Sequence, residues 1–177
     1  CGAACLHETY YTFQDCRCIY FHYDGQIQHG HFEHQELTTD DVGHMLKESA
    51  EALTILSYWD YNNASFPSLE TNPSIRWLFL EGGLLEEMPE LHANRKLDRL
   101  VVREQRLRRL PDISHMRRLK WLDVQSNELT AIPSLTELTA LERVMVSYNN
   151  LTELPSLDSL KKLVKLRAAN NQLRKLG

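Results

Sequence analysis

The sequence lacks the features on which most enzymes and membrane proteins depend. It has no run of eighteen apolar residues, so we expect no membrane-spanning helix. It also has no glycine-rich phosphate loop, no paired nucleophile and base, and no side chains at metal-ligand spacing. We therefore expect a protein that is not an enzyme and that uses neither a cofactor nor a metal ion.

Basic residues are scarce in the first half of the chain. Residues 1–92 carry 3 Lys/Arg and 15 Asp/Glu, a net charge of −12, and residues 93–177 carry 17 and 9, a net charge of +8; the two sum to −4. This split favours electrostatic steering of a partner or end-to-end contacts between chains. An ordinary solvated surface of mixed charge is the other interpretation.

Proline occurs six times, and five of the six prolines stand 22 residues apart, at Pro67, Pro89, Pro111, Pro133 and Pro155. A second pattern keeps the same period: apolar residues at the first, fourth, sixth and eleventh positions and Asn at the ninth. It is clearest in Leu119–Leu129, Leu141–Leu151 and Leu163–Leu173. Weaker copies, with Gln105, Gly83 and Tyr61 in place of Asn, are Leu97–Leu107, Ile75–Leu85 and Leu53–Asn63. We count six repeats.

The pattern predicts the structure of one repeat. Leu122 and Val124 are two residues apart, so on a strand both point into the core. Asn127 can bond to neighbouring backbone through its amide, and Pro133 ends the extended segment ahead of a short helical turn on the outer face. One such repeat cannot bury its apolar side alone, whereas a stack of three or more can. Because only the last three repeats carry Asn, we expect the earlier ones to be less regular at that corner.

These residues resemble the leucine-rich repeat of the 22-residue class, typified by a regulator family of protein phosphatase 1. The resemblance implies an α/β solenoid, a right-handed superhelix whose parallel strands line a concave face. We expect two parts, an N-terminal cap over residues 1–52 and the repeats over residues 53–177. More loosely, the cap, from Cys16-Arg-Cys18-Ile-Tyr-Phe-His-Tyr through the helix after it, is similar to the N-termini of secreted invertebrate leucine-rich immune proteins.

All four cysteines lie ahead of the repeats, at Cys1, Cys5, Cys16 and Cys18. An even number in this place looks like the disulfide-stapled cap of secreted leucine-rich-repeat proteins, with three pairings open. A four-thiolate zinc site fits the spacing poorly, and free thiols are the remaining alternative. A chain that begins at Cys1 is expected to be a mature or trimmed form, and a bacterial lipoprotein origin stays open.

Two further features belong to this interpretation. Asn63 and Asn150 begin N-glycosylation motifs, in agreement with secretion. Residues 19–32 predict a β-hairpin around Asp24-Gly25, and a helix is expected from about Thr38, so that both cover the open end of the first repeat. The histidines of this region are expected on an exposed polar strand face and not around a metal: His22, His29, His31 and His34.

The binding surface is expected on the concave face, at the second, fourth and sixth positions after each repeat's first apolar residue. These positions hold all three tryptophans, and Trp beside Arg is typical of the centre of a protein interface. Aromatic filling of ordinary strands is the alternative. The candidate protein-binding residues are Trp59, Trp77, Phe79, Arg99, Arg103, Trp121, Asp123, Arg143, Met145, Lys165 and Arg167.

The predicted function is a secreted, non-enzymatic module that binds a protein through this face, in innate immune recognition. The alternative is an intracellular regulatory subunit that binds an enzyme such as a protein phosphatase. The basic residues between Arg103 and Lys120 do not form one stripe, so nucleic acid is not expected. The open edge of the last repeat is expected to pair with a second copy, as a homodimer, or to be covered by further repeats.

Overall fold

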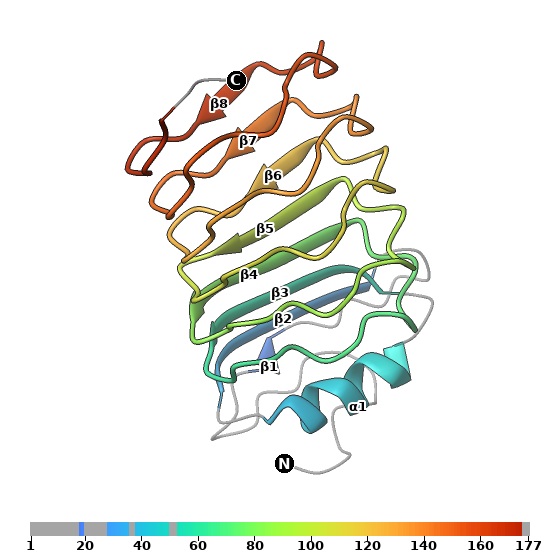
Figure 1. Cartoon of the computed structure of the whole chain (residues 1–177). Helices are drawn as coiled ribbons and strands as arrows, with labels where there is room; N and C mark the ends of the chain where they lie inside the picture. The colour runs from blue at the N-terminus through green and yellow to red at the C-terminus, as the bar shows by residue number, and fades with distance from the viewer. Residues whose placement is uncertain (1–17, 20–27, 36–37, 50–52, 175–177) are drawn as a thin grey trace.

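We describe the fold from a computed structural model, in which residues 18–19, 28–35, 38–49 and 53–174 are described. It contains one eight-stranded sheet whose strand order equals the order along the chain, β1 to β8 (Figure 1). The strands are β1 Cys18–Ile19, β2 Gln28–Gln35, β3 Leu53–Tyr61, β4 Trp77–Gly83, β5 Arg99–Arg103, β6 Trp121–Asp123, β7 Arg143–Met145 and β8 Lys165–Arg167.

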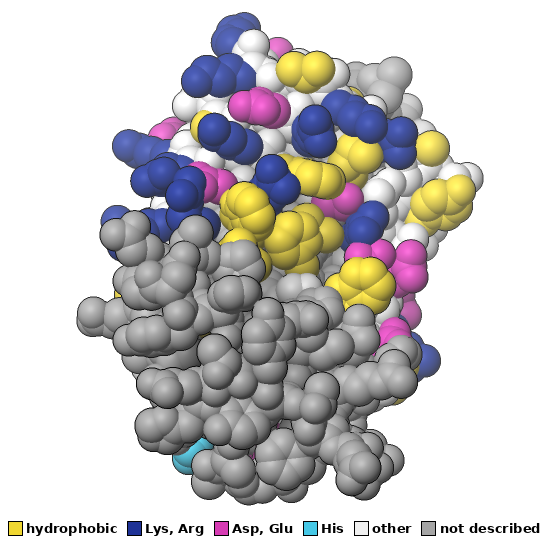
Figure 2. Space-filling model, turned by 180° about the vertical axis from the view of Figure 1, so that it is seen from behind, with side chains coloured by type: hydrophobic (Ala, Val, Ile, Leu, Met, Phe, Trp, Pro, Cys, Tyr) yellow, Lys and Arg dark blue, Asp and Glu magenta, His cyan; other side chains and the backbone are white. Residues whose placement is uncertain are grey.

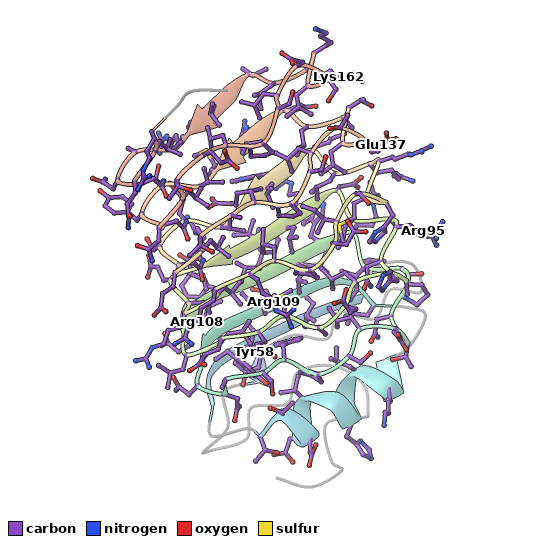
Figure 3. All side chains as sticks on the ribbon, in the orientation of Figure 1. Tyr58, Arg95, Arg108, Arg109, Glu137 and Lys162 are labelled. Carbon is purple, nitrogen blue, oxygen red and sulfur yellow. The ribbon has the colours of Figure 1, made fainter. Side chains whose placement is uncertain are left out.

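The six strands from β3 to β8 are parallel and repeat with the predicted period. Leu56 pairs with Leu78 and Leu78 with Leu100, and the same 22-residue step continues to Leu166. From Leu56 to Val144 these side chains are buried, and Tyr58 lies with them inside the solenoid (Figure 3). The predicted parallel solenoid is therefore confirmed.

The segments opposite the sheet contain no helix, although we expected a short helical turn in each of them. In the repeat that holds Met116, two consecutive turns close through bonds from Met116 N to Ile113 O at 3.0 Å and from Leu119 N to Met116 O at 2.9 Å. The apolar anchors stand three residues apart, as Leu135, Leu138 and Leu141 also do. Turns of three residues point every anchor into the core, whereas an α-helix of 3.6 residues per turn would rotate them away.

A ladder of amide side chains closes the corner at which each strand ends. Asn127 Nδ2 donates to Val102 O at 2.8 Å in the preceding repeat, and Asn127 Oδ1 accepts from Leu107 N at 3.1 Å. Asn149 and Asn171 make the equivalent bonds. Each ladder residue bonds backbone groups of the repeat before it as well as its own.

The corner at Gln105 keeps one of the two ladder bonds and shifts the other. Its Oε1 accepts from Leu85 N at 3.0 Å, as the asparagines do, but its Nε2 donates to Gly82 O at 2.7 Å, two residues beyond the position that corresponds to Val102. The residue before the ladder position is left-handed in every repeat, a conformation that costs most residues about 1–2 kcal/mol. These residues are Asp60, Gly82, Glu104, Ser126, Tyr148 and Asn170.

The region ahead of the repeats joins the same sheet. β1 pairs antiparallel with β2, as the predicted hairpin requires, and β2 pairs in parallel with β3. The turn of the hairpin lies outside the described residues. Since β2 continues the sheet of the repeats, the boundary between residues 52 and 53 stays a prediction.

The one helix of the described residues is α1, Thr39–Ser49. Thr38 caps it: Asp41 N donates to Thr38 Oγ1 at 3.2 Å and Thr38 N to Asp41 Oδ2 at 2.9 Å, a reciprocal capping box. Val42 and Leu46 bury its apolar side, and Asn72 Nδ2 donates to Leu46 O at 2.9 Å. The helix therefore packs at the N-terminal end of the solenoid (Figure 1). Within the described residues, no helix has the length and apolar character needed to cross a membrane.

Candidate protein-binding face

Three rows of residues, 22 positions apart along each row, cross the outer side of β3 to β8, and we call this surface the concave face. The strand register pairs neighbours throughout the first two rows and from Trp59 to Arg103 in the third. The last three members of the third row follow just after β6, β7 and β8. The first row is Ile55, Trp77, Arg99, Trp121, Arg143 and Lys165. The second is Ser57, Phe79, Val101, Asp123, Met145 and Arg167, and the third is Trp59, Glu81, Arg103, Gln125, Ser147 and Ala169.

Four neighbours in the first row form a stack of alternating indoles and guanidiniums, which we call the Trp–Arg ladder. Arg99 Cζ lies 4.4 Å from the ring centre of Trp77 and 5.4 Å from that of Trp121. Arg143 Cζ lies 5.2 Å from the ring centre of Trp121 on the next strand. Cation–π contacts of this kind contribute about 0.5–2 kcal/mol each, so the ladder holds its long side chains in place before any partner arrives.

A pocket of about 250 Å³ opens beside the ladder. It is lined by Arg76, Trp77, Asp98, Arg99, Lys120, Trp121, Glu142 and Arg143. Half of these residues are the Trp–Arg ladder. The other half precede the ladder residues by one position and alternate in charge from repeat to repeat.

This second set was not among the candidate binding residues: Arg76, Asp98, Lys120 and Glu142. Asp98 is buried and accepts from Arg76 Nε at 2.7 Å, while Arg118 Nε lies 3.6 Å from its other oxygen. A 22-residue alternation of positive and negative residues was the signal that could have identified the set.

The middle of the second row is covered, whereas Arg167 at its end is exposed. Val101 is 2 % exposed, Asp123 is 1 % exposed and Met145 is 6 % exposed. The candidate residues Asp123 and Met145 are therefore not available to a partner, which would meet mainly the first row. Trp59 in the third row is 47 % exposed.

Two carboxylates of this face share one arginine. Arg103 Nη2 bonds Glu81 Oε2 at 2.7 Å, and its Nη1 lies 4.0 Å from Asp123 Oδ2. Burial raises the pKa of Asp123, and the N–H of Gln125 and the charge of Arg103 oppose this only in part. Arg103 is thus held within the face, although its sequence position alone marked it as a binding residue.

The other four cations of the face have no carboxylate partner among the residues that the structure describes. They are Arg99, Arg143, Lys165 and Arg167, on β5, β7 and β8. Seen from behind, hydrophobic side chains gather near the middle of the molecule and Lys/Arg side chains are frequent toward its C-terminal end (Figure 2). The concave face therefore changes from aromatic to basic along the solenoid.

The remaining candidate residues are placed only in part. Cys1, Cys5, Cys16 and His22 lie outside the described residues, and Cys18, His29, His31 and His34 are described only as backbone of β1 and β2. Disulfides and glycosylation therefore stay predictions. Of the two glycosylation motifs, Asn150 is exposed and Asn63 is half-buried. Within the described part of the chain, no three His, Cys, Asp or Glu side chains could jointly hold a metal ion.

Comparison with solved structures gives matches to leucine-rich-repeat proteins. The structure of YopM, a leucine-rich effector protein from Yersinia pestis, superposes with a TM-score of 0.56 at 24 % identity, over 71 % of this chain and 40 % of that one. The leucine-rich-repeat protein LIC12759 of Leptospira interrogans superposes with a TM-score of 0.52 at 17 % identity, over 85 % of this chain and 50 % of that one.

This chain thus spans half or less of the length of both proteins. By sequence it matches no protein-family model and no curated protein. The solenoid, the 22-residue period and the structural matches agree: by its fold the chain is a leucine-rich-repeat solenoid.

Proposed function

We propose that this chain is a secreted, non-enzymatic module that binds a protein partner through the concave face, in innate immune recognition. The observation that carries the proposal is the Trp–Arg ladder. Indole and guanidinium groups dominate the energetic centres of protein interfaces, and groups that are already ordered lose little entropy on binding. Arg99 lies between two indoles, and the pocket beside it offers a concave place for a protruding side chain.

The extracellular part of the proposal is supported by the sequence. Four cysteines ahead of the repeats are typical of an oxidising compartment, and exposed Asn150 fits a glycan acceptor. Titration of free thiols in the native, unreduced protein tests this part. No reactive thiol is the expected result, and four reactive thiols would favour the intracellular alternative.

Affinity capture from the extracellular fluid of the source tests the binding surface. The baits are the unmodified chain, Trp121→Ala and Tyr148→Ala. Tyr148 is a matched control because it is exposed and aromatic but lies at the left-handed corner after β7, outside the three rows. We expect a protein that the unmodified and Tyr148→Ala baits retain and that Trp121→Ala loses by about tenfold or more. Equal retention by all three baits would place the binding surface elsewhere.

A homodimer through the C-terminal strand is a second proposal. Val164 is 86 % exposed and Leu166 is 40 % exposed, so the described C-terminal edge presents apolar side chains to solvent. Sedimentation velocity over a range of concentrations tests it. We expect a dimer that Val164→Glu dissociates; a monomer at every concentration would contradict the proposal.

A further inference from the structure

The cations of the concave face fall into two groups that differ in what holds them. Arg103 bonds the carboxylate of Glu81, and Arg76, at the rim, bonds that of Asp98. Arg99 and Arg143 are instead held by indole rings and form no ion pair within the described chain. Stacking uses the flat side of a guanidinium and leaves its N–H groups available for an acceptor in the plane.

Arg99 and Arg143 also lie at a defined separation. They occupy the same row on β5 and β7, with β6 between them, and both line the 250 Å³ pocket. Neighbouring strands are about 4.8 Å apart, so the two positions are about 10 Å apart. Two turns of an α-helix rise about 11 Å, which matches this separation closely.

The net charge of the concave face determines whether an acidic or a basic partner is attracted to it. Its three rows hold five cations and two carboxylates, Glu81 and Asp123, and both of these lie against Arg103. The rim of the pocket adds two cations and two carboxylates, which cancel: Arg76, Asp98, Lys120 and Glu142. The remaining positive charge is on β5, β7 and β8, and no buried carboxylate of the face neutralises it. An anionic partner gains the Coulomb attraction of these groups, whereas a basic one is repelled.

We propose that the partner meets this face with an acidic polypeptide segment, which places one carboxylate on Arg99, a second on Arg143, and further acidic groups over Lys165 and Arg167. The inference rests on the proposed function and names the chemistry of the segment that would bind. A helix with acidic residues two turns apart fits the spacing. Trp121, between the two arginines, lies under the apolar side chains of the same helix face.

A nucleic acid fits this surface less well than an acidic peptide. Bases bind proteins by stacking on aromatic faces. Here Arg99 lies over the rings of Trp77 and Trp121, and Arg143 lies over the ring of Trp121, so guanidinium groups already occupy positions where a base would stack. A polyphosphate also carries charge at every nucleotide and would meet Asp98 and Glu142 in the same pocket. Two separate carboxylates need a cation at only two places, Arg99 and Arg143.

The test uses fluorescein-labelled, alanine-rich helical peptides and fluorescence anisotropy at low ionic strength. One peptide carries two glutamates two turns apart, and its matched partner carries glutamine at both positions. We expect the glutamate peptide to bind at least about tenfold more tightly than the glutamine peptide, and to weaken as salt is added. Arg143→Gln should weaken the glutamate peptide by about tenfold. Arg108→Gln, the same substitution in the segment opposite the face, should leave binding unchanged (Figure 3).

Exchanging the charges of position 143 and of the peptide distinguishes a direct contact from loss of the fold. Arg143→Glu should lose the glutamate peptide, and a peptide with lysine in place of the second glutamate should restore binding to that variant. Three results would each overturn the inference. They are equal affinity of the glutamate and glutamine peptides, failure of the lysine peptide to bind Arg143→Glu, and tighter binding of a single-stranded RNA oligonucleotide than of the glutamate peptide. The proposed function would still stand if Trp121→Ala loses a captured protein, so the two failures are distinguishable.

Discussion

The side-chain oxygen of Gln105 accepts the N–H of Leu85 at 3.0 Å, the bond that Asn127 makes with Leu107 one repeat later at 3.1 Å. A glutamine thus replaces an asparagine in the ladder without leaving the N–H of Leu85 unpaired. The ladder matters for stability because its partners are buried main-chain groups. An unpaired buried N–H or C=O costs about 1–3 kcal/mol.

Asn149→Ala should therefore lower the free energy of unfolding by about 3 kcal/mol, since Leu129 N and Val124 O both lose their partner. Urea denaturation followed by circular dichroism measures the change. Asn150→Ala, in protein made without glycosylation, is the adjacent control and should change the value by less than about 0.5 kcal/mol, because Asn150 is exposed. Similar losses for both variants would show that the ladder bonds contribute little.

Two glycines should respond to alanine in opposite directions. At Gly83 the φ angle is +133° and a Cβ atom would lie 2.2 Å from Tyr61 O, so Gly83→Ala is expected to cost about 2 kcal/mol or more. Gly43 lies within α1 and its Cβ would meet only Pro67 Cβ at 3.4 Å. Gly43→Ala should add up to about 1 kcal/mol through helix propensity. Thermal denaturation of both variants decides; a stabilised Gly83→Ala would disprove the close contact with Tyr61.

The buried position of Asp123 predicts a pH effect on stability. Its pKa is raised in the folded state above the ordinary 3.8, so the folded chain binds the proton more tightly than the unfolded chain does. The contribution of Asp123 to stability therefore falls as the pH rises from 3.8 through the folded pKa. Asp123→Asn should remove this fall and be the more stable form at neutral pH. Denaturation of both proteins between pH 3.5 and about 7 measures the difference. If their stabilities run parallel over this range, Asp123 does not titrate as inferred.

Core leucines at equivalent positions should differ in importance according to their place in the stack. Leu122→Ala removes a fully buried side chain between two repeats and should cost about 2–5 kcal/mol. Leu166→Ala changes the same position of β8, where the side chain is 40 % exposed, and should cost less than half as much. Urea denaturation of the 177-residue chain measures both values. Equal costs would mean that Leu166 is covered in solution.

The sequence was sufficient to predict the period, the strands and the inward residues. Apolar residues recur every 22 positions in all six repeats, as Leu100 and Leu122 do. It was not sufficient for the turns opposite the sheet, where a three-residue spacing fits both a short helix and paired turns. It also identified the tryptophans and arginines of the concave face. Their stacking could not be predicted, since it depends on the side-chain conformations of Arg99 and Arg143 between strands.

Burial within the concave face was the other quantity that the sequence could not supply. Asp123 and Met145 hold outward positions, yet both are buried. The rim residues Asp98 and Lys120 were missed because they precede the expected outward positions by one residue.

The strands lie in the sheet in the same order as they occur along the chain. This arrangement determines how the molecule responds to force and to changes in its length. Each strand from β3 to β7 touches only the units before and after it, so stretching from the C-terminal end would detach one unit at a time in a series of small, similar steps. For the same reason, an additional 22-residue unit inserted between β6 and β7 would lengthen the stack by one strand spacing while every existing pairing finds an equivalent neighbour.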